Sequence, residues 1–394
     1  MLNRRSLRIK VMQALYAYHQ AVGSDFLLAN DRIAEEFAPD LTSPEPQDRK
    51  VLQGQRKLAE VIFKEWHKTK ADPEKTEDAA VNEAVADAIS FYEKQVKKEG
   101  TFFEGQMLHA AESIHDQYIH LLNLPTALLR VMEDERDREA RRFTPSKEAL
   151  LDTTRFEQNQ VLEKLVGNKQ LQDLTIRRKL QWNGEQEMEA LRTAWRQEIK
   201  QDAEFQAYLA APGGNYTEDQ EALKHLYKTF VFKEGALATQ LDEADLNWEE
   251  NRPVVKNLVV KTIKMLDEAA DENLELMALS ANWAEDKEFA QSLYQQTLAD
   301  DERYEKLIAE SVQNWDVERV AQLDKIVLKM ALCEMHLFRS IPVKVTINEY
   351  IEISKMYSTP KSKQFINGIL DKLAQDLTAS GAIRKSGRGL LDNQ

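Results

Sequence analysis

The chain has 394 residues, of which 30% are charged and 42% are hydrophobic, and it contains only 13 glycines and 10 prolines. This length allows two or three domains, and the scarcity of turn residues disfavours β-sandwiches and barrels. No run of 18 apolar residues occurs, so we expect no membrane span. The basic start MLNRRSLRIK lacks the apolar segment of a signal peptide, and the single cysteine, Cys333, fits a reducing compartment. We therefore expect a cytoplasmic protein.

The net charge of −14 is unevenly distributed along the chain. Residues 1–22 carry four Lys/Arg and no acid, and residues 317–394 carry twelve Lys/Arg against eight Asp/Glu, so each end has a net charge of +4. The segment between them, 23–316, therefore has a net charge of −22. A polyanion responds to the local field within about 8–10 Å, so the basic ends leave nucleic-acid binding open despite the acidic total.

The first predicted element is a helix that begins after Asn3, a suitable N-cap residue, and stops near Gly23 and Ser24. Its apolar residues recur at helical spacing and define one buried face, whereas the arginines of its first turns are expected to lie mostly off that face. The apolar positions are Leu7, Val11, Ala14, Leu15 and Tyr18, and the arginines are Arg4, Arg5 and Arg8.

The middle of the chain reads as a series of amphipathic helices separated by polar breaks. The breaks are 39–48, 71–78, 142–148 and 210–219, and the helical runs are 52–68, 81–98, 110–142, 156–179, 186–209, 217–232 and 254–270. Residues 71–105 are polar and weakly periodic, which favours partial disorder. No fixed-period repeat is present, so a solenoid is not supported.

The C-terminal block predicts three helices. The first carries a dense apolar stripe and ends before Pro342, the second runs to about Tyr357, and the third begins near Pro360. The expected buried positions are Leu323, Ile326, Val327, Met330, Ala331, Leu337, Ile347, Ile351, Ser354, Ile366, Ile369, Leu370, Leu373 and Leu377. After Ser380 we expect a mobile tail. The predicted fold class is all-α.

No pattern in the sequence supports catalysis. P-loop, G-x-G-x-x-G, H-E-x-x-H and G-x-S-x-G motifs are missing. His109, His115 and His120 are clustered but lack the partners of a metal site, so structural or solvent-facing roles are favoured. Cys333 lies within an apolar stripe, which favours an inert buried thiol. We expect no enzyme activity, no metal and no cofactor.

Two basic groups are better candidates for function. The arginines of the first helix present planar donors suited to phosphate, although alone they are more often a solvated face. Lys361 and Lys363 precede Phe365 at a predicted helix start, where an aromatic ring can stack an unpaired base and lysines can hold phosphate. Phe365 taken alone is somewhat better explained as a core residue. Asn367–Gly368 within a helix suggests close packing or contact at Gly368.

Three segments together resemble the NusB family of bacterial antitermination factors. They are RRSLRIKVMQALYAY (4–18), LDKIVLKMALCEM (323–335), which ends near Glu334, and IPVKVTINEYIEISKMYSTPKSKQFINGILDKL (341–373). The first is similar to the arginine-rich opening helix of the family, the second to its central helix, and the third to its P-x-K-V-x-I-N-E and K-F-V-N-G-x-L-D-K segments. The order of the three makes the resemblance specific, and the long acidic middle resembles the enlarged Bacteroidetes form.

The resemblance implies a NusB-like helical bundle with a long helical insertion after the first helix. Its core would comprise residues 1–22 and 284–378. The acidic insertion would comprise residues 23–283, and the tail residues 379–394. Segment 24–105 is atypical even of the enlarged form. The family pairs with the small-subunit ribosomal protein NusE and binds boxA-type single-stranded RNA. On RNA polymerase the pair suppresses premature termination and assists ribosomal RNA maturation.

Carried over by position, the resemblance implies two groups of site residues. The RNA-contacting positions are Arg4, Arg5, Arg8, Tyr16, Lys361, Lys363, Gln364 and Phe365, and the acidic positions facing the ribosomal partner are Glu318 and Asp324. Ser6 stands where an arginine is common, and Lys361 where an acid is common. Asn348 and Glu349 belong to the family pattern, and we favour a structural role for them. The two RNA-contacting groups are expected to be adjacent in space.

Two alternatives remain open. A scaffold could use the acidic middle to bind basic partners such as ribosomal proteins, with RNA binding lost. An accessory domain of a ribosomal RNA methyltransferase is disfavoured, because the cofactor-binding domain and a suitable nucleophilic cysteine are missing. Whether the chain forms a homodimer, and which RNA it prefers, is not determined by the sequence.

Overall fold

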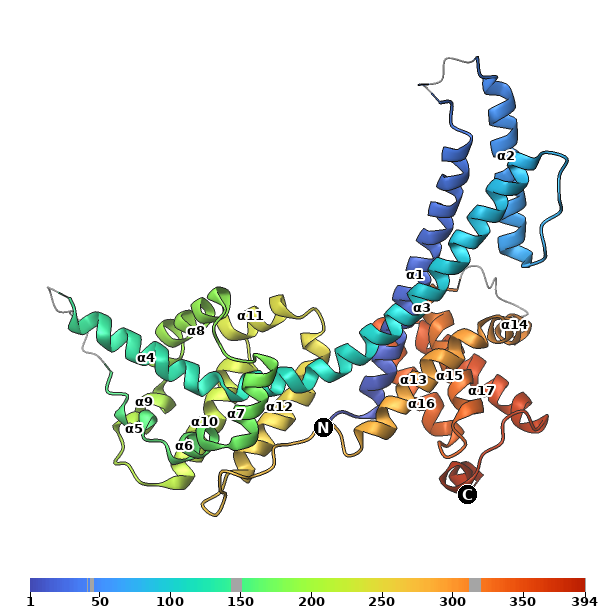
Figure 1. Ribbon diagram of the computed structural model, residues 1–394. Helices are drawn as coiled ribbons and strands as arrows, with labels where there is room; N and C mark the ends of the chain where they lie inside the picture. Colours follow the sequence, from blue (N-terminus) through green and yellow to red (C-terminus); the bar gives the residue numbers. More distant parts are fainter. Residues whose placement is uncertain (41, 43–45, 143–150, 312–319, 394) are drawn as a thin grey trace. The chain divides into compact units, whose positions relative to one another are not determined.

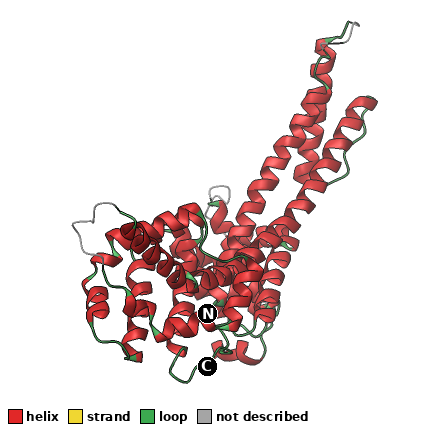
Figure 2. Ribbon diagram, turned by 60° about the vertical axis from the view of Figure 1, so that its left-hand side comes forward, coloured by secondary structure: helices red, strands yellow, loops and turns green. Residues whose placement is uncertain are grey.

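The computed structural model describes residues 1–40, 42, 46–142, 151–311 and 320–393. Throughout these residues it contains helices and loops but no strand, which confirms the predicted all-α class (Figure 2). None of the described helices is long and apolar enough to cross a membrane. The chain divides into two compact units, the first formed by residues 1–6 and 110–286 and the second by residues 7–109 and 287–394. Each is described by itself.

The first unit is built from short helices around a core of large side chains. Its elements are the end of α3 (Ala79–Leu122), α4 (Leu124–Ala140), α5 (Thr154–Glu157), α6 (Gln160–Gly167), α7 (Lys169–Arg178), α8 (Glu185–Gln197), η1 (Ile199–Gln201), α9 (Ala203–Ala210), α10 (Tyr216–Leu226), η2 (Tyr227–Val231), α11 (Ala236–Ala244) and α12 (Trp248–Met265). Asn159 and Asn168 cap α6 and α7, and Trp195 and Trp248 are fully buried. In this unit the predicted runs 156–179, 186–209 and 217–232 are helical but more finely divided than expected.

The second unit contains two groups of helices joined by α1 (Arg4–Glu36). One group comprises α13 (Trp283–Ala299), α14 (Asp301–Ser311), α15 (Gln322–Leu337), α16 (Val343–Tyr357), α17 (Ser362–Ala379) and η4 (Gly387–Asn393), and the other is formed by α2 (Arg49–Thr69) and the first part of α3 (Figure 1). The three predicted C-terminal helices correspond to α15, α16 and α17. The central helix α15 is buried on nearly all sides.

The prediction that the first helix stops near Gly23 and Ser24 is wrong, because α1 continues without a break to Glu36. A glycine within a helix costs only about 1 kcal/mol relative to alanine, so packing of the following turns can override it. Those turns carry Ala29, Ile33 and Phe37, which are buried. Tertiary contacts beyond the glycine therefore decide where this helix ends.

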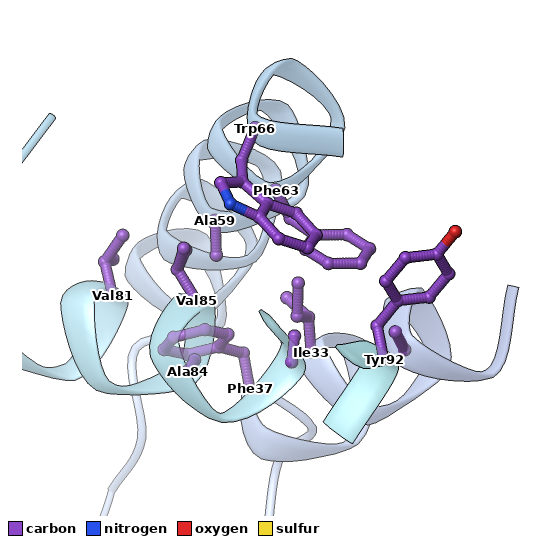
Figure 3. Close-up of a cluster of buried hydrophobic side chains, with 11 residues drawn as sticks. Ile33, Phe37, Ala59, Phe63, Trp66, Val81, Ala84, Val85 and Tyr92 are labelled. Atoms are coloured by element: carbon purple, nitrogen blue, oxygen red, sulfur yellow. The ribbon is translucent and has the colours of Figure 1, made fainter. Parts of the chain in front are cut away.

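The segment expected to be partly disordered forms a helix with a core of its own. Residues 79–105 belong to α3, so the disorder prediction is wrong for them. Their small and apolar side chains pack against the aromatic face of α2 and the extension of α1, as Figure 3 shows. The buried cluster comprises Ala29, Ile33, Phe37, Ala59, Phe63, Trp66, Val81, Ala84, Val85, Ala88 and Tyr92. We call this group the three-helix cluster.

The C-terminal tail, expected to be mobile, makes defined contacts in the structure. Ile383 is buried, and the backbone N–H of Ser386 donates to the carbonyl of Arg339 at 3.0 Å. A Cβ atom at Gly389 would lie 2.0 Å from that same carbonyl oxygen, so only glycine fits there. The tail differs from the prediction because the burial of Ile383 and the close approach of Gly389 to the Arg339 carbonyl hold this polar segment in place.

We predict that Phe63→Ala destabilises the three-helix cluster by about 3–5 kcal/mol, because it deletes a fully buried ring. Hydrogen exchange measured by mass spectrometry should show earlier deuteration of peptides from α2 and residues 79–92, with α15 unchanged. Val61→Ala is the matched control, since Val61 is exposed on the same helix, and it should change the opening free energy by less than about 0.5 kcal/mol. Equal effects of the two variants would contradict the assigned core.

Candidate nucleic-acid interface

The N-terminus of α1 is held by Asn3, as predicted. The Asn3 Oδ1 atom accepts hydrogen bonds from the backbone N–H of Ser6 at 2.9 Å and from its hydroxyl at 3.2 Å. Such a cap satisfies donors that the first helical turn leaves without partners. Arg4 is half-buried, with its Nε 3.8 Å from Asp286 Oδ1, while Arg5 is exposed. The first turn thus places Arg5 toward solvent.

Arg8 does not lie off the buried face, so that prediction is wrong. Its side chain is buried, its Nε and Nη2 donate to the two carboxylate oxygens of Glu334 at 2.7 and 2.8 Å, and its Nη1 lies 3.5 Å from Glu349. Burial alone would lower the pKa of Arg8, but hydrogen bonding to Glu334 raises it above its usual value. The guanidinium also faces the ring of Phe289 at 5.4 Å. A paired, buried guanidinium cannot contact phosphate without breaking this arrangement.

A signal for the burial of Arg8 was present in the sequence. Arg8 precedes Leu15 by seven residues, which on a helix places the two side chains only about 20° apart. Leu15 was correctly predicted to be buried, and Glu334 is the one acid in the otherwise apolar run MALCEM (330–335), where a charge needs a partner. The periodicity together with the acid in that run therefore pointed to an internal ion pair.

Glu334 accepts hydrogen bonds from two further side chains. Thr346 donates to Oε1 at 2.9 Å and Tyr350 to Oε2 at 3.2 Å, both from α16. Glu334 is fully buried, so these donors replace the water that its carboxylate would otherwise bind. The family-pattern residue Glu349 approaches the same arginine, which fits the structural role favoured for it.

The start of α17 presents the second basic group, with Lys361 at the N-cap position and the other residues in the first turn. Lys361, Lys363 and Gln364 are exposed and Phe365 is half-buried. Around Gly368 no described residue lies within 4 Å of the position a Cβ would take, so the close packing expected there is not made by the described part of the chain. This face of α17 therefore combines lysines, an amide, an aromatic ring and open backbone.

Asp324 positions that turn instead of facing outward. Its carboxylate is buried and accepts hydrogen bonds from the hydroxyls of Ser358 at 2.5 Å and Ser362 at 2.7 Å. The expectation that Asp324 lies at a partner surface is corrected by this burial. The predicted partner residue Glu318 lies outside the described residues.

Other predicted features fall as follows. Tyr16 is exposed, on the part of α1 that belongs to the second unit. His120 stacks on Trp182, and among the described residues no group of three or more His, Cys, Asp or Glu could hold a metal ion. Arg4 and Arg5 belong to one unit and Phe365 to the other, so the predicted adjacency of the two basic groups remains a prediction.

Comparison with known proteins identifies the C-terminal part of the chain. Residues 256–375 match the model of the NusB family. The chain carries a NusB-family domain. This confirms the family resemblance and covers two of the three segments on which it was found, 323–335 and 341–373. With 394 residues the chain is larger than a typical NusB.

Three transcription antitermination proteins NusB are among its relatives. The protein of Salinibacter ruber is 40% identical over 105 residues, 27% of this chain and 66% of its own length. Those of Chloroherpeton thalassium and Thermodesulfovibrio yellowstonii are 47% and 40% identical over 85 and 90 residues, covering 22% and 23% of this chain and 40% and 60% of their own lengths. The chain thus aligns with less than two thirds of each. A solved structure of NusB from T. maritima is 29% identical, with a TM-score of 0.23 over 34% of this chain and 86% of its own.

We predict that Arg8→Ala and Glu334→Ala each destabilise the second unit by about 3–5 kcal/mol, because each leaves a buried charge without its counter-charge. The free energy of unfolding can be measured in urea with hydrogen exchange across α15 and α16. Arg5→Ala, an exposed arginine one turn earlier, should change it by less than about 0.5 kcal/mol. The double variant Arg8→Ala, Glu334→Ala should cost less than the sum of the two single variants; strict additivity would show that the pair is not coupled.

We predict that Cys333 is unreactive at neutral pH in the folded protein. Burial raises the pKa of its thiol to about 12, so the thiolate that reacts with disulfide reagents is scarce. A thiol-reactive dye should label one cysteine only after unfolding in guanidinium. Rapid labelling of the native protein at pH 7.5 would contradict the placement of Cys333 in the core.

Proposed function

We propose that this chain is a non-catalytic RNA-binding antitermination factor of the cytoplasm. It binds boxA-type single-stranded RNA together with the ribosomal protein NusE, within an antitermination complex on RNA polymerase, and thereby supports transcription and maturation of ribosomal RNA. The observation that carries the proposal is the NusB-family match, because its residues 256–375 include the exposed Lys361–Phe365 turn. The relatives are antitermination proteins by name.

The chemistry of the turn supports contact with an unpaired strand. Single-stranded RNA is bound by aromatic rings that stack on bases and by cations that follow the backbone. Phe365 supplies a ring that is partly open to solvent, and Lys361 and Lys363 supply cations at the start of a helix, where backbone N–H groups also favour anions. In the other basic group, at the start of α1, Arg5 is an exposed cation.

We leave two of the expected residues out of this proposal because their side chains are buried. Arg8 is assigned to the internal ion pair with Glu334 and Asp324 to the turn before α17. The proposed RNA contacts are therefore Arg4, Arg5, Tyr16, Lys361, Lys363, Gln364 and Phe365. The proposed contact with NusE rests on Glu318 and not on Asp324.

We predict that Phe365→Ala weakens binding of a boxA-type single strand about 10-fold to 100-fold, the loss typical of one stacked base. Fluorescence anisotropy with a labelled RNA, with and without NusE, measures the affinity. Lys361→Ala and Lys363→Ala should each lower the slope of log affinity against log salt by about 0.7. Lys94→Ala, an exposed lysine on α3, serves as the control and should leave affinity unchanged.

An Arg5→Ala, Phe365→Ala double variant with wild-type affinity would overturn the residue assignment. If the wild-type protein binds NusE but no RNA, the alternative of a protein–protein scaffold replaces the proposal.

A further inference from the structure

The helix α2 has a second apolar stripe that the three-helix cluster does not use. Phe63 and Trp66 face the cluster and are buried, whereas Val51, Leu58 and Val61 are 54%, 44% and 59% exposed. On a helix, residues three and four positions apart share a face, so these three form one continuous stripe of about three turns. Single exposed hydrophobic residues are ordinary, but a stripe with helical spacing is typical of a helix-binding face.

The stripe follows the heptad pattern of a coiled-coil seam. Val51 and Leu58 occupy a positions and Gly54 and Val61 occupy d positions. A Cβ atom at Gly54 would meet no described residue within 4 Å, so no packing contact in that part of the chain requires this glycine. A glycine costs helix stability, and here it leaves a hollow in the stripe where another helix can approach closely.

A row of lysines borders the stripe on its open side. Lys50, Lys57 and Lys64 occupy successive g positions, about 10.5 Å apart along the helix, and all three are exposed. The opposite border is not available, since Gln55 donates to Asp78 at 2.7 Å and Ile62 packs on the three-helix cluster. With six Lys/Arg against two Glu, α2 has a net charge of +4 within a chain of −14.

The row of lysines on α2 favours a partner helix with acidic side chains over a second copy of α2. In an antiparallel pair of α2 helices the g positions face each other, so a second copy would bring its lysines against those of the first. In a parallel pair they would face Gln55 and Ile62, which offer no opposite charge. Carboxylates facing the row would instead be attracted, because e and g charges set partner choice in helical pairs.

We propose that the outer face of α2 binds an acidic amphipathic helix of another protein. The partner helix lays Leu or Ile side chains on Val51, Leu58 and Val61 and aligns Asp or Glu side chains with Lys50, Lys57 and Lys64. The face is small, so the complex is of the weak and transient class. The face lies in residues 49–64, outside the family match at 256–375, and shares no residue with the proposed RNA contacts.

The test uses two synthetic three-heptad peptides with Leu at a and d positions, one with Glu and the other with Lys at every e and g position. Like charges at these positions keep each peptide from pairing with itself. Anisotropy with the full-length chain should give at least tenfold tighter binding of the Glu peptide, with affinity that falls as salt rises. Equal binding of the two peptides, or none, overturns the proposal.

Charge reversal separates recognition from folding. The variant Lys50→Glu, Lys57→Glu, Lys64→Glu should reverse the preference toward the Lys peptide, which an unfolded protein cannot do. Val51→Asp, Leu58→Asp should abolish binding of both peptides while circular dichroism stays unchanged. The matched control Lys94→Glu, Lys97→Glu, Lys98→Glu makes the same change of charge at exposed positions of α3 and should keep the wild-type preference.

Two other results would also overturn the proposal. A wild-type dimer in sedimentation that Leu58→Asp converts to monomer would assign the stripe to a second copy. If the triple charge reversal weakens RNA binding as much as Phe365→Ala and leaves the peptide preference unchanged, the lysine row belongs to an RNA surface. Failure of the RNA experiments alone leaves the peptide result standing, so the two proposals fail separately.

Discussion

The carboxylate of Glu334 and the guanidinium of Arg8 meet in the interior of the second unit, where each charge would be costly alone. Removing a carboxylate and a guanidinium from water costs several kcal/mol each, and only good geometry with additional hydrogen bonds offsets that cost. Here the geometry is bidentate, and Thr346 and Tyr350 supply the additional donors. Because the four groups come from α1, α15 and α16, this network favours one relative placement of three helices over alternatives in which a charge stays buried and unpaired.

The exposed turn before α17 depends on a second buried carboxylate. Asp324 lies in the first turn of α15 and accepts hydrogen bonds from Ser358 and Ser362, which lie on either side of Lys361 and just before Lys363. Both buried acids of α15, Asp324 and Glu334, therefore stabilise the packing of the helices and not an outer surface. The residues matched to the family by position thus include buried residues that stabilise the fold and exposed residues such as Lys361 and Lys363.

Helical periodicity predicted much of this fold, because it reports which face of each helix is apolar. It predicted α15, α16 and α17 closely, since Pro342 and Pro360 mark their boundaries. It could not end α1 correctly, because contacts of Ile33 with residues far along the chain outweigh the local effect of Gly23. Periodicity likewise cannot name the partner of Arg8, because Glu334 lies 326 positions away in the sequence and only the folded chain brings the two together. Phe365 taken alone was somewhat better explained as a core residue, and in the structure it is half-buried.

The continuity of α1 has a consequence for how such a chain can vary in length. The face that carries Leu7 and Leu15 packs in one core, and the face that carries Ala29 and Ile33 packs in another, with no loop between them. Deleting one residue from this shaft would turn the second face by about 100° relative to the first, whereas deleting seven would turn it by only about 20°. We therefore expect that α1 tolerates a change of length by one heptad better than a change by one residue, because the heptad nearly keeps the angle between its two buried faces.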